Sequence, residues 1–112
     1  MSYLLQHVRR ALLAGRERAS LVAATNLVAT GGDFQISLTW NDLARGETGY
    51  SVEVSDTGGG AGFSELATTS ANATSYVHAP LPSLTTKFYR VRPFNGSLYG
   101  DYSNEATATT NL

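Results

Sequence analysis

The clearest pattern in the chain is a strict alternation of apolar and polar residues over residues 34–40. Apolar side chains occupy every second position, at Phe34, Ile36, Leu38 and Trp40, and small or amide side chains lie between them. Successive side chains of a β-strand point to opposite faces, so the stretch predicts a half-buried strand with these four residues facing inward. Trp40, at the end of the row, is expected to be a core residue.

Six further segments have strand character, and turns rich in Gly, Asn or Asp lie between most of them. They are residues 26–30, 50–54, 63–69, 74–78, 87–92 and 102–110. Alternation predicts that Tyr50, Val52 and Val54 face inward. In the last segment, Ala106 and Ala108 are small enough to face a filled core. About seven short strands without a helix between them predict an all-β fold, a seven-stranded antiparallel Ig-like β-sandwich.

The segment 87–92 places Tyr89 and Val91 on one face and Phe88, Arg90 and Arg92 on the other. Pro93 is expected to end its regular pairing, because proline cannot donate a hydrogen bond to a ladder. The residues 95–101 that follow predict a hairpin loop carrying Leu98 and Tyr99.

The first 20 residues have a different period. Residues 1–14 predict an α-helix with an apolar stripe about 120° wide, assuming about 100° per residue. An isolated helix of this length is marginal in water, so the stripe needs a partner. The helix could pack on its own domain, dock on another chain or lie on a membrane surface. The candidate partner-binding residues are Leu4, Leu5, Val8, Arg9 and Leu12.

The net charge of −1 is unevenly distributed between these two parts. Residues 1–20 carry four arginines and one glutamate, +4 − 1 = +3, whereas residues 21–112 carry four cations and eight carboxylates, +4 − 8 = −4. We therefore divide the chain into an N-terminal amphipathic helix and linker, 1–20, and a β-domain, 21–112. An acidic body argues against nucleic acid as a ligand of the β-domain. No apolar run approaches the roughly 20 residues of a membrane span.

The sequence lacks the patterns on which catalysis depends. There is no cysteine, no Gly-x-Ser-x-Gly motif and no histidine cluster, and His78 is the only histidine of the β-domain. The glycine-rich residues 58–62 are followed by no lysine, so they do not form a phosphate-binding loop. We expect no enzymatic activity, no cofactor and no metal site.

Several short motifs follow one another in an order typical of one family. They are 36–42, 47–53, 63–67, 74–76, 89–92 and 102–106. Over about residues 21–110 the chain resembles a fibronectin type III domain of the form common in bacterial and phage proteins. The resemblance implies one sheet of three strands and one of four, with Trp40 between them. The chain departs from the family at Lys87, where a corner-forming tyrosine is usual, and at Leu84, where glycine is common. We expect Leu81 and Leu84 to pack inward and hold this corner.

The resemblance implies a non-catalytic structural or interaction protein. Our first hypothesis is a component of a phage virion, a capsid decoration or tail protein, attached to a protein partner by the N-terminal helix with the sandwich projecting. The alternative is a spacer or binding module from a secreted, extracellular bacterial protein such as a polysaccharide-degrading enzyme. A carbohydrate or cell-surface ligand would bind at the loops. Large apolar side chains near a loop end can anchor such an interface. The candidates there are Phe94, Leu98 and Tyr99.

Overall fold

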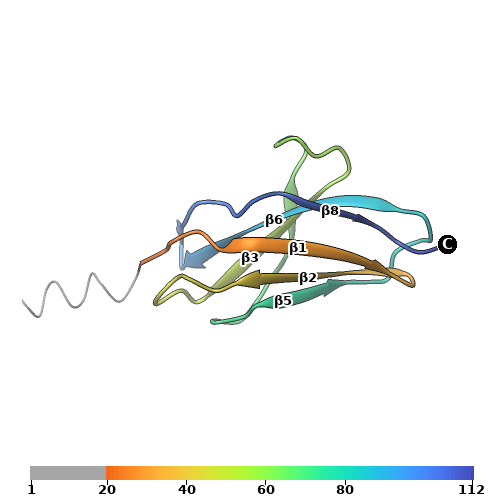
Figure 1. Ribbon diagram of the computed structural model, residues 1–112. Coiled ribbons are helices and arrows are strands. Elements are labelled where there is room, and N and C mark those ends of the chain that lie inside the picture. Colours follow the sequence, from red (N-terminus) through yellow and green to blue (C-terminus); the bar gives the residue numbers. More distant parts are fainter. Residues whose placement is uncertain (1–19) are drawn as a thin grey trace, which may run out of the picture.

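The computed structural model describes residues 20–112, which form two antiparallel β-sheets packed face to face (Figure 1). Its strands are β1 (Thr25–Gly32), β2 (Gln35–Asn41), β3 (Gly49–Ser55), β4 (Ser64–Thr68), β5 (Ser75–His78), β6 (Thr86–Asn95), β7 (Leu98–Tyr99) and β8 (Ala106–Thr109). The helix predicted in residues 1–14 lies outside the described residues. The proposed domain boundary at residue 20 lies at their edge.

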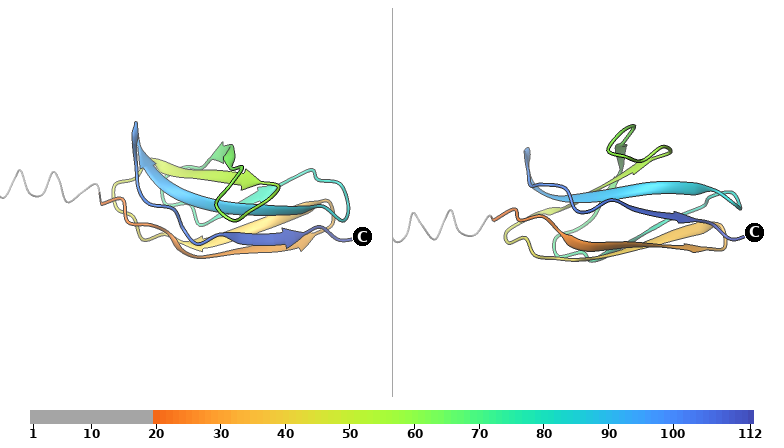
Figure 2. Two further views of the ribbon diagram at one scale, coloured as in Figure 1. Left: turned by 90° about the horizontal axis from the view of Figure 1, so that it is seen from above. Right: turned by 45° about the horizontal axis from the view of Figure 1, so that its top comes forward.

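One sheet has the order β1-β2-β5, and the other has β4-β3-β6 with β7 and β8 both paired to β6. The two layers are visible in both views of Figure 2. β7 pairs with one end of β6 and β8 with the other, so together they are one last strand that is interrupted in the middle. The prediction of a three-stranded and a four-stranded sheet is confirmed, except that the last strand of the second sheet is broken. For this reason there are eight strands instead of seven.

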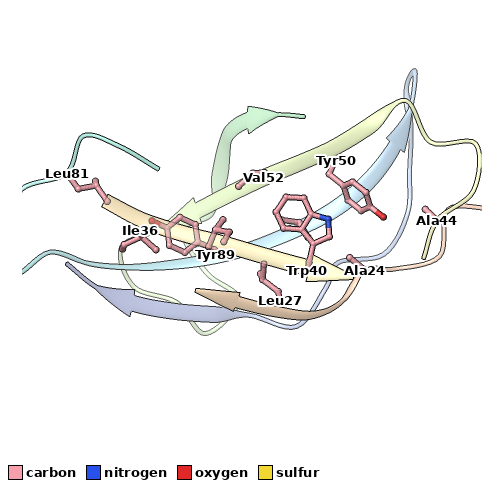
Figure 3. Packing of buried hydrophobic residues seen from close by; sticks show 11 residues of the cluster. Ala24, Leu27, Ile36, Trp40, Ala44, Tyr50, Val52, Leu81 and Tyr89 are labelled. Carbon is pink, nitrogen blue, oxygen red and sulfur yellow. The ribbon is translucent and has the colours of Figure 1, made fainter. Parts of the chain in front are cut away.

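The core lies between the layers (Figure 3) and consists mainly of the inward side chains of β2, β3 and β6. Trp40 is 4% exposed, and its ring centroid lies 5.5 Å from that of Tyr50. Tyr50 and Val52 are fully buried, as alternation predicts, whereas Val54 is half-buried. Ala106 and Ala108 pack against the core from β8. The prediction that Trp40 is a core residue is confirmed.

Phe34 does not belong to the buried row, so this part of the prediction is wrong. It lies in the turn between β1 and β2, where Gly32 pairs with Gln35 across the turn, and its side chain is 60% exposed. Its φ of 59° is left-handed, which turns the side chain away from the row that begins at Ile36. Alternation alone does not reveal where a strand gives way to its turn.

The corner between β5 and β6 is held differently from our expectation. Leu81 is buried, as predicted, but Leu84 is 64% exposed and has a φ of 55°. The residue that closes the corner is Thr110, which is 2% exposed. Its hydroxyl donates to the carbonyl of Pro82 at 2.7 Å and accepts from the backbone N–H of Thr85 at 2.8 Å. A buried hydroxyl from the end of the chain therefore closes a corner for which the resemblance implied a tyrosine.

Replacing Thr110 with valine tests this role, because valine keeps the shape and removes only the hydroxyl. We expect Thr110→Val to lower the free energy of unfolding by about 1–3 kcal/mol, since two backbone groups lose their partner. Unfolding in urea measures this difference in the free energy of unfolding. The control is Thr109→Val, which removes an exposed hydroxyl bonded only to that of Thr86 and should change stability by less than about 0.5 kcal/mol. Equal effects of the two variants would contradict the role of Thr110.

Leu84 adopts the left-handed conformation that glycine adopts at low cost. In this conformation a residue with a Cβ is less stable than glycine by about 1–2 kcal/mol. Part of the gain from glycine is offset, because glycine has more conformational freedom in the unfolded chain. We expect Leu84→Gly to stabilise the domain by up to about 1 kcal/mol in the same assay. Leu84→Ala, which keeps the Cβ, should give none of this gain, and an equal gain from alanine would point to the exposed side chain instead.

Pro93 does not end β6, which continues to Asn95 and pairs Pro93 with Tyr50 of β3. In an antiparallel ladder, the N–H and C=O of one residue point to the same neighbour. The carbonyl of Pro93 accepts from Gly100, so its missing donor faces the interruption between β7 and β8. Proline is tolerated there because no ladder partner is lost.

Candidate binding surface on the outer face of the second sheet

The outer face of the second sheet is formed by alternate residues of β3 and β6. The ladder pairs Glu53 with Arg90 and Ser51 with Arg92. Directly paired residues lie on the same face with their Cβ atoms about 5 Å apart, so opposite charges meet across the two central strands. The prediction that Phe88, Arg90 and Arg92 share the face opposite Tyr89 and Val91 agrees with the burial pattern of β6.

Glu53 is the centre of this face, and its side chain is only 8% exposed. One carboxylate oxygen accepts from Nε of Arg90 at 2.9 Å. The other accepts from the hydroxyl of Tyr102 at 2.9 Å and lies 3.7 Å from a terminal guanidinium nitrogen of Arg92. A buried carboxylate is tolerated only when it is paired and hydrogen-bonded, and these three side chains meet that condition.

The two guanidinium groups are stacked between aromatic rings. Arg90 lies 4.2 Å from the ring centroid of Phe63 and 3.7 Å from that of Tyr102. Arg92 lies 4.6 Å from Tyr102 and 3.9 Å from Tyr99. Guanidinium groups over aromatic faces attract the ring quadrupole. We call this row, Phe63, Arg90, Tyr102, Arg92 and Tyr99, the arginine ladder. Burial, followed by the hydrogen bond to Glu53, raises the pKa of Tyr102.

Tyr102 reaches the ladder because side chains hold the interrupted part of the last strand in place. Ser103 bonds to Val91 twice, through its N–H and through its hydroxyl, at 2.8 and 3.0 Å. The Glu105 carboxylate accepts from the N–H groups of Gly59 and Gly60, each at 2.9 Å, which lowers the pKa of Glu105. Side-chain hydrogen bonds, together with the backbone bond from Ser103 to Val91, therefore replace the ladder between β7 and β8.

Asn104, between these two residues, joins the segment to the other sheet. Its amide donates to the carbonyl of Leu27 and accepts from the N–H of Leu27, both at 2.9 Å. Leu27 is free for this contact because the register of β1 shifts between Thr25 and Val28, where Asn26 has a φ of 59°. Asn104 thus takes the place of a backbone partner and closes the sandwich along the side where β1 and β8 lie next to each other (Figure 1).

The structure places one of the predicted loop residues, Tyr99, at the exposed end of the ladder, where it is 48% exposed. Leu98, which precedes it, is 65% exposed and points to the opposite face. Gly96, with a φ of 58°, begins the two-residue turn that connects β6 to β7 and makes the position of this hairpin well defined. Phe94 is half-buried, and its ring centroid is 6.2 Å from that of Tyr99. The other candidates, Leu4, Leu5, Val8, Arg9 and Leu12, lie outside the described residues.

Sequence reasoning missed the centre of the surface, namely Glu53, Phe63 and Tyr102. The available signal was a glutamate at an outward position of a central strand, together with two arginines at outward positions of another. Strand register over such a sequence separation is not readable from one sequence, so the pairing of Glu53 with Arg90 became visible only in the structure.

Other candidate chemistry in this part of the chain is limited. Nδ1 of His78 lies 2.8 Å from the hydroxyl of the buried Tyr89, and burial, followed by the charge of Lys87, lowers the pKa of His78. Within residues 20–112 no three metal-ligating side chains come together. In the same range no helix is long and apolar enough to cross a membrane.

Two antiparallel sheets with the order β1-β2-β5 and β4-β3-β6 with a last strand define an immunoglobulin-like sandwich. Comparison with solved structures identifies which immunoglobulin-like fold this is. An Fn3-like protein from Clostridium thermocellum aligns over 85% of this chain and 96% of its own, with 25% identity and a TM-score of 0.67. The fold is therefore that of a fibronectin type III domain. No family model matches the sequence, and a search of curated proteins returns no match.

Two further similar structures contain this fold as part of a longer chain. A β-1,2-glucanase from Parabacteroides distasonis aligns with a TM-score of 0.70 and 17% identity, over 84% of this chain and 14% of its own. The FN1–FN3 domains of chicken CNTN1 align with a TM-score of 0.67 and 24% identity, over 84% and 35%. At these identities the likeness shows the fold alone. In both cases the chain spans a minor share of the similar protein.

Proposed function

We propose that this chain is a non-catalytic binding module, and that its ligand contacts the exposed end of the arginine ladder at Tyr99. The observation that supports this is the contrast between the exposure of the ring and its fixed position. Tyr99 is 48% exposed, yet Arg92 lies 3.9 Å from its ring centroid and the two-residue turn restrains its backbone. A rigid aromatic side chain loses little conformational entropy when it binds, which is why such residues often dominate binding energy.

Two kinds of ligand have support, a carbohydrate and a protein. The glucanase contains a similar domain as 14% of its chain, which favours a module that binds or spaces next to a carbohydrate-active protein. Tyrosine and arginine are enriched in protein–protein interfaces, which favours a protein ligand. Exposed aromatic and guanidinium groups suit both kinds of ligand, so the test has one arm for each.

The carbohydrate arm is affinity electrophoresis of the chain in gels that contain β-1,2-glucan. In the protein arm, a photo-crosslinking amino acid replaces Ser97, an exposed residue of the same hairpin, in the native host. We expect binding in one arm, weakened about tenfold by Tyr99→Ala, which corresponds to about 1.4 kcal/mol. The control position is Phe34, an aromatic residue with 60% exposure in the β1–β2 turn, where alanine should have no effect. Absence of binding in both arms would overturn the proposal and leave a spacer role.

The more specific hypothesis of a phage virion component stays a prediction. Its anchor, the apolar stripe of residues 1–14, lies outside the described residues. One geometric fact is compatible with it. Residue 20 and the C-terminus lie at opposite ends of the sandwich (Figure 1), so an anchor before residue 20 would leave the rest of the domain projecting. Co-purification of the chain with virions from its native host, lost after deletion of residues 1–19, would support it.

A further inference from the structure

One end of the sandwich brings together the start of the described chain, the β2–β3 loop and the β6–β7 hairpin. Ser20 and Arg45 exchange two backbone hydrogen bonds of 2.8 and 2.9 Å. The side-chain amide of Asn95 donates to the carbonyl of Gly46 at 2.8 Å. Gly100 is packed so closely against Leu21 that a Cβ there would overlap its carbonyl. The chain therefore enters the sandwich at a fixed place beside the hairpin.

Three large apolar side chains are exposed on the three segments that meet there. Val22 is 50% exposed, Leu43 49% and Leu98 65%. Leu98 follows the strand alternation, so its side chain points to the opposite face from Tyr99 and lies on the inner side of the hairpin, beyond the end of the core. We call Val22, Leu43 and Leu98 the end patch. It is distinct from the arginine ladder, to which Tyr99 belongs.

The same segments carry an excess of negative charge. Asp42, Glu47 and Asp101 lie in the β2–β3 loop and directly after Gly100, against one cation, Arg45. Asp42 is partly exposed and accepts from the hydroxyl of Tyr50 at 2.6 Å, and Asp101 is exposed. Glu47 is only 5% exposed and accepts from the N–H of Asn72 at 2.8 Å, so it is not available to another segment. The accessible charges beside the end patch are thus two carboxylates, Asp42 and Asp101, and one cation, Arg45, a formal charge of −2 + 1 = −1.

The sequence before Ser20 has the complementary properties. Residues 1–19 contain four arginines and one glutamate, a charge of +4 − 1 = +3, and the predicted apolar stripe of Leu4, Leu5, Val8 and Leu12. Residues 15–19 connect the predicted helix to Ser20 and can span at most about 18 Å. Since packed sheets are about 10 Å apart, this length is sufficient to reach across the end of the sandwich.

We propose that residues 1–19 fold back onto their own domain, with the stripe covering the end patch and the arginines facing its carboxylates. The tether makes this contact intramolecular, so even a weak interface is favoured by a high effective concentration. The β-domain would then provide the partner that a short amphipathic helix needs in water. This contact leaves the exposed side of Tyr99 accessible and does not depend on the binding role proposed for it. It is an alternative to attachment of the stripe to a virion protein, because the same apolar residues cannot cover both partners at once.

The absence of cysteine from the chain permits a direct test with one spin label. Gln6→Cys, a position outside the stripe, carries a nitroxide on the ¹⁵N-labelled full-length chain. We expect loss of the amide signals of Val22, Leu43 and Leu98. The signals of Val77 in β5 and Thr109 at the other end of the sandwich should persist. In the labelled background, Val8→Glu in the centre of the stripe should restore the lost signals. Leu13→Glu, which makes the same change outside the stripe, should not.

Two outcomes overturn the proposal. If the end-patch signals remain, or if signals elsewhere are lost instead, residues 1–19 do not cover the end patch. The second outcome comes from mixing nitroxide-labelled chain without ¹⁵N with ¹⁵N-labelled chain that has no nitroxide. Signal loss in that mixture would show that the segment binds a second copy and not its own domain. Neither outcome affects the Tyr99 assays, so the two proposals fail or succeed separately.

Discussion

Replacing Glu53 with alanine should destabilise the domain by about 2–4 kcal/mol. The substitution leaves Nε of Arg90 and the hydroxyl of Tyr102 without their acceptor, and it leaves two cations side by side on one face. Removal of one partner from a buried ion pair generally costs about 3–5 kcal/mol. We lower the range because Arg90 and Arg92 are 23% and 27% exposed and water can partly solvate them. Urea unfolding at neutral pH gives the difference in free energy.

Glu65 supplies the matched control for this prediction. It belongs to the neighbouring strand β4, its side chain is exposed, and its carboxylate accepts only from the hydroxyl of Ser51, at 2.7 Å. Glu65→Ala removes the same charge and should cost less than about 1 kcal/mol. If both variants lost the same stability, net charge would explain the result and the central position of Glu53 would not.

The second large effect is expected at Asn104. Asn104→Ala leaves the N–H and the carbonyl of Leu27 without partners and releases β1 from the last strand, so we expect a loss of about 2–4 kcal/mol. Hydrogen exchange adds a local readout, because the amide of Leu27 should lose protection before the rest of β1.

Asn41 is the control, since its amide makes one exposed contact of 3.4 Å, with the hydroxyl of Thr25. Asn41→Ala should change stability by less than about 0.5 kcal/mol. Unchanged protection of the Leu27 amide in Asn104→Ala would contradict the role assigned to Asn104, even if the global stability fell.

The inner half of the fold was predictable from the sequence, because burial on one face imposes a period of two. Ile36, Leu38 and Trp40 occupy the predicted side of β2, and Tyr50 and Val52 that of β3. The errors occur where backbone conformation overrides this pattern. Phe34 and Leu84 have left-handed φ values, which direct apolar side chains into solvent.

The candidate surface was less predictable, because it depends on contacts between distant segments. Alternation places Ser51, Glu53 and Ser55 on the solvent side of β3, yet all three are buried. Glu53 is paired with Arg90 and Arg92, and Ser51 donates to Glu65. Ser55 donates to the carbonyl of Ala61 and accepts from the N–H groups of Thr57 and Gly58. Of the predicted residues, only Tyr99 marks its exposed end.

The interrupted last strand explains how the candidate surface is assembled. A continuous strand beside β6 would satisfy its own backbone. Here the side chains of Tyr102, Ser103, Asn104 and Glu105 each bond to a different part of the domain, and Tyr102 is thereby brought between Arg90 and Arg92. The arginine ladder is consequently part of what holds the domain together, and its end at Tyr99 is positioned before any ligand arrives.

¹⁵N relaxation of the arginine Nε–Hε groups in the ligand-free chain tests most directly whether the ladder is held in place before a ligand binds. If Glu53 and the stacked rings hold the ladder in place, the order parameters of Arg90 and Arg92 should be about 0.8, close to those of rigid backbone. Arg45, which is exposed in the β2–β3 loop, serves as the internal reference and should be lower. Order parameters below about 0.6 for Arg90 and Arg92 would contradict a preformed binding surface.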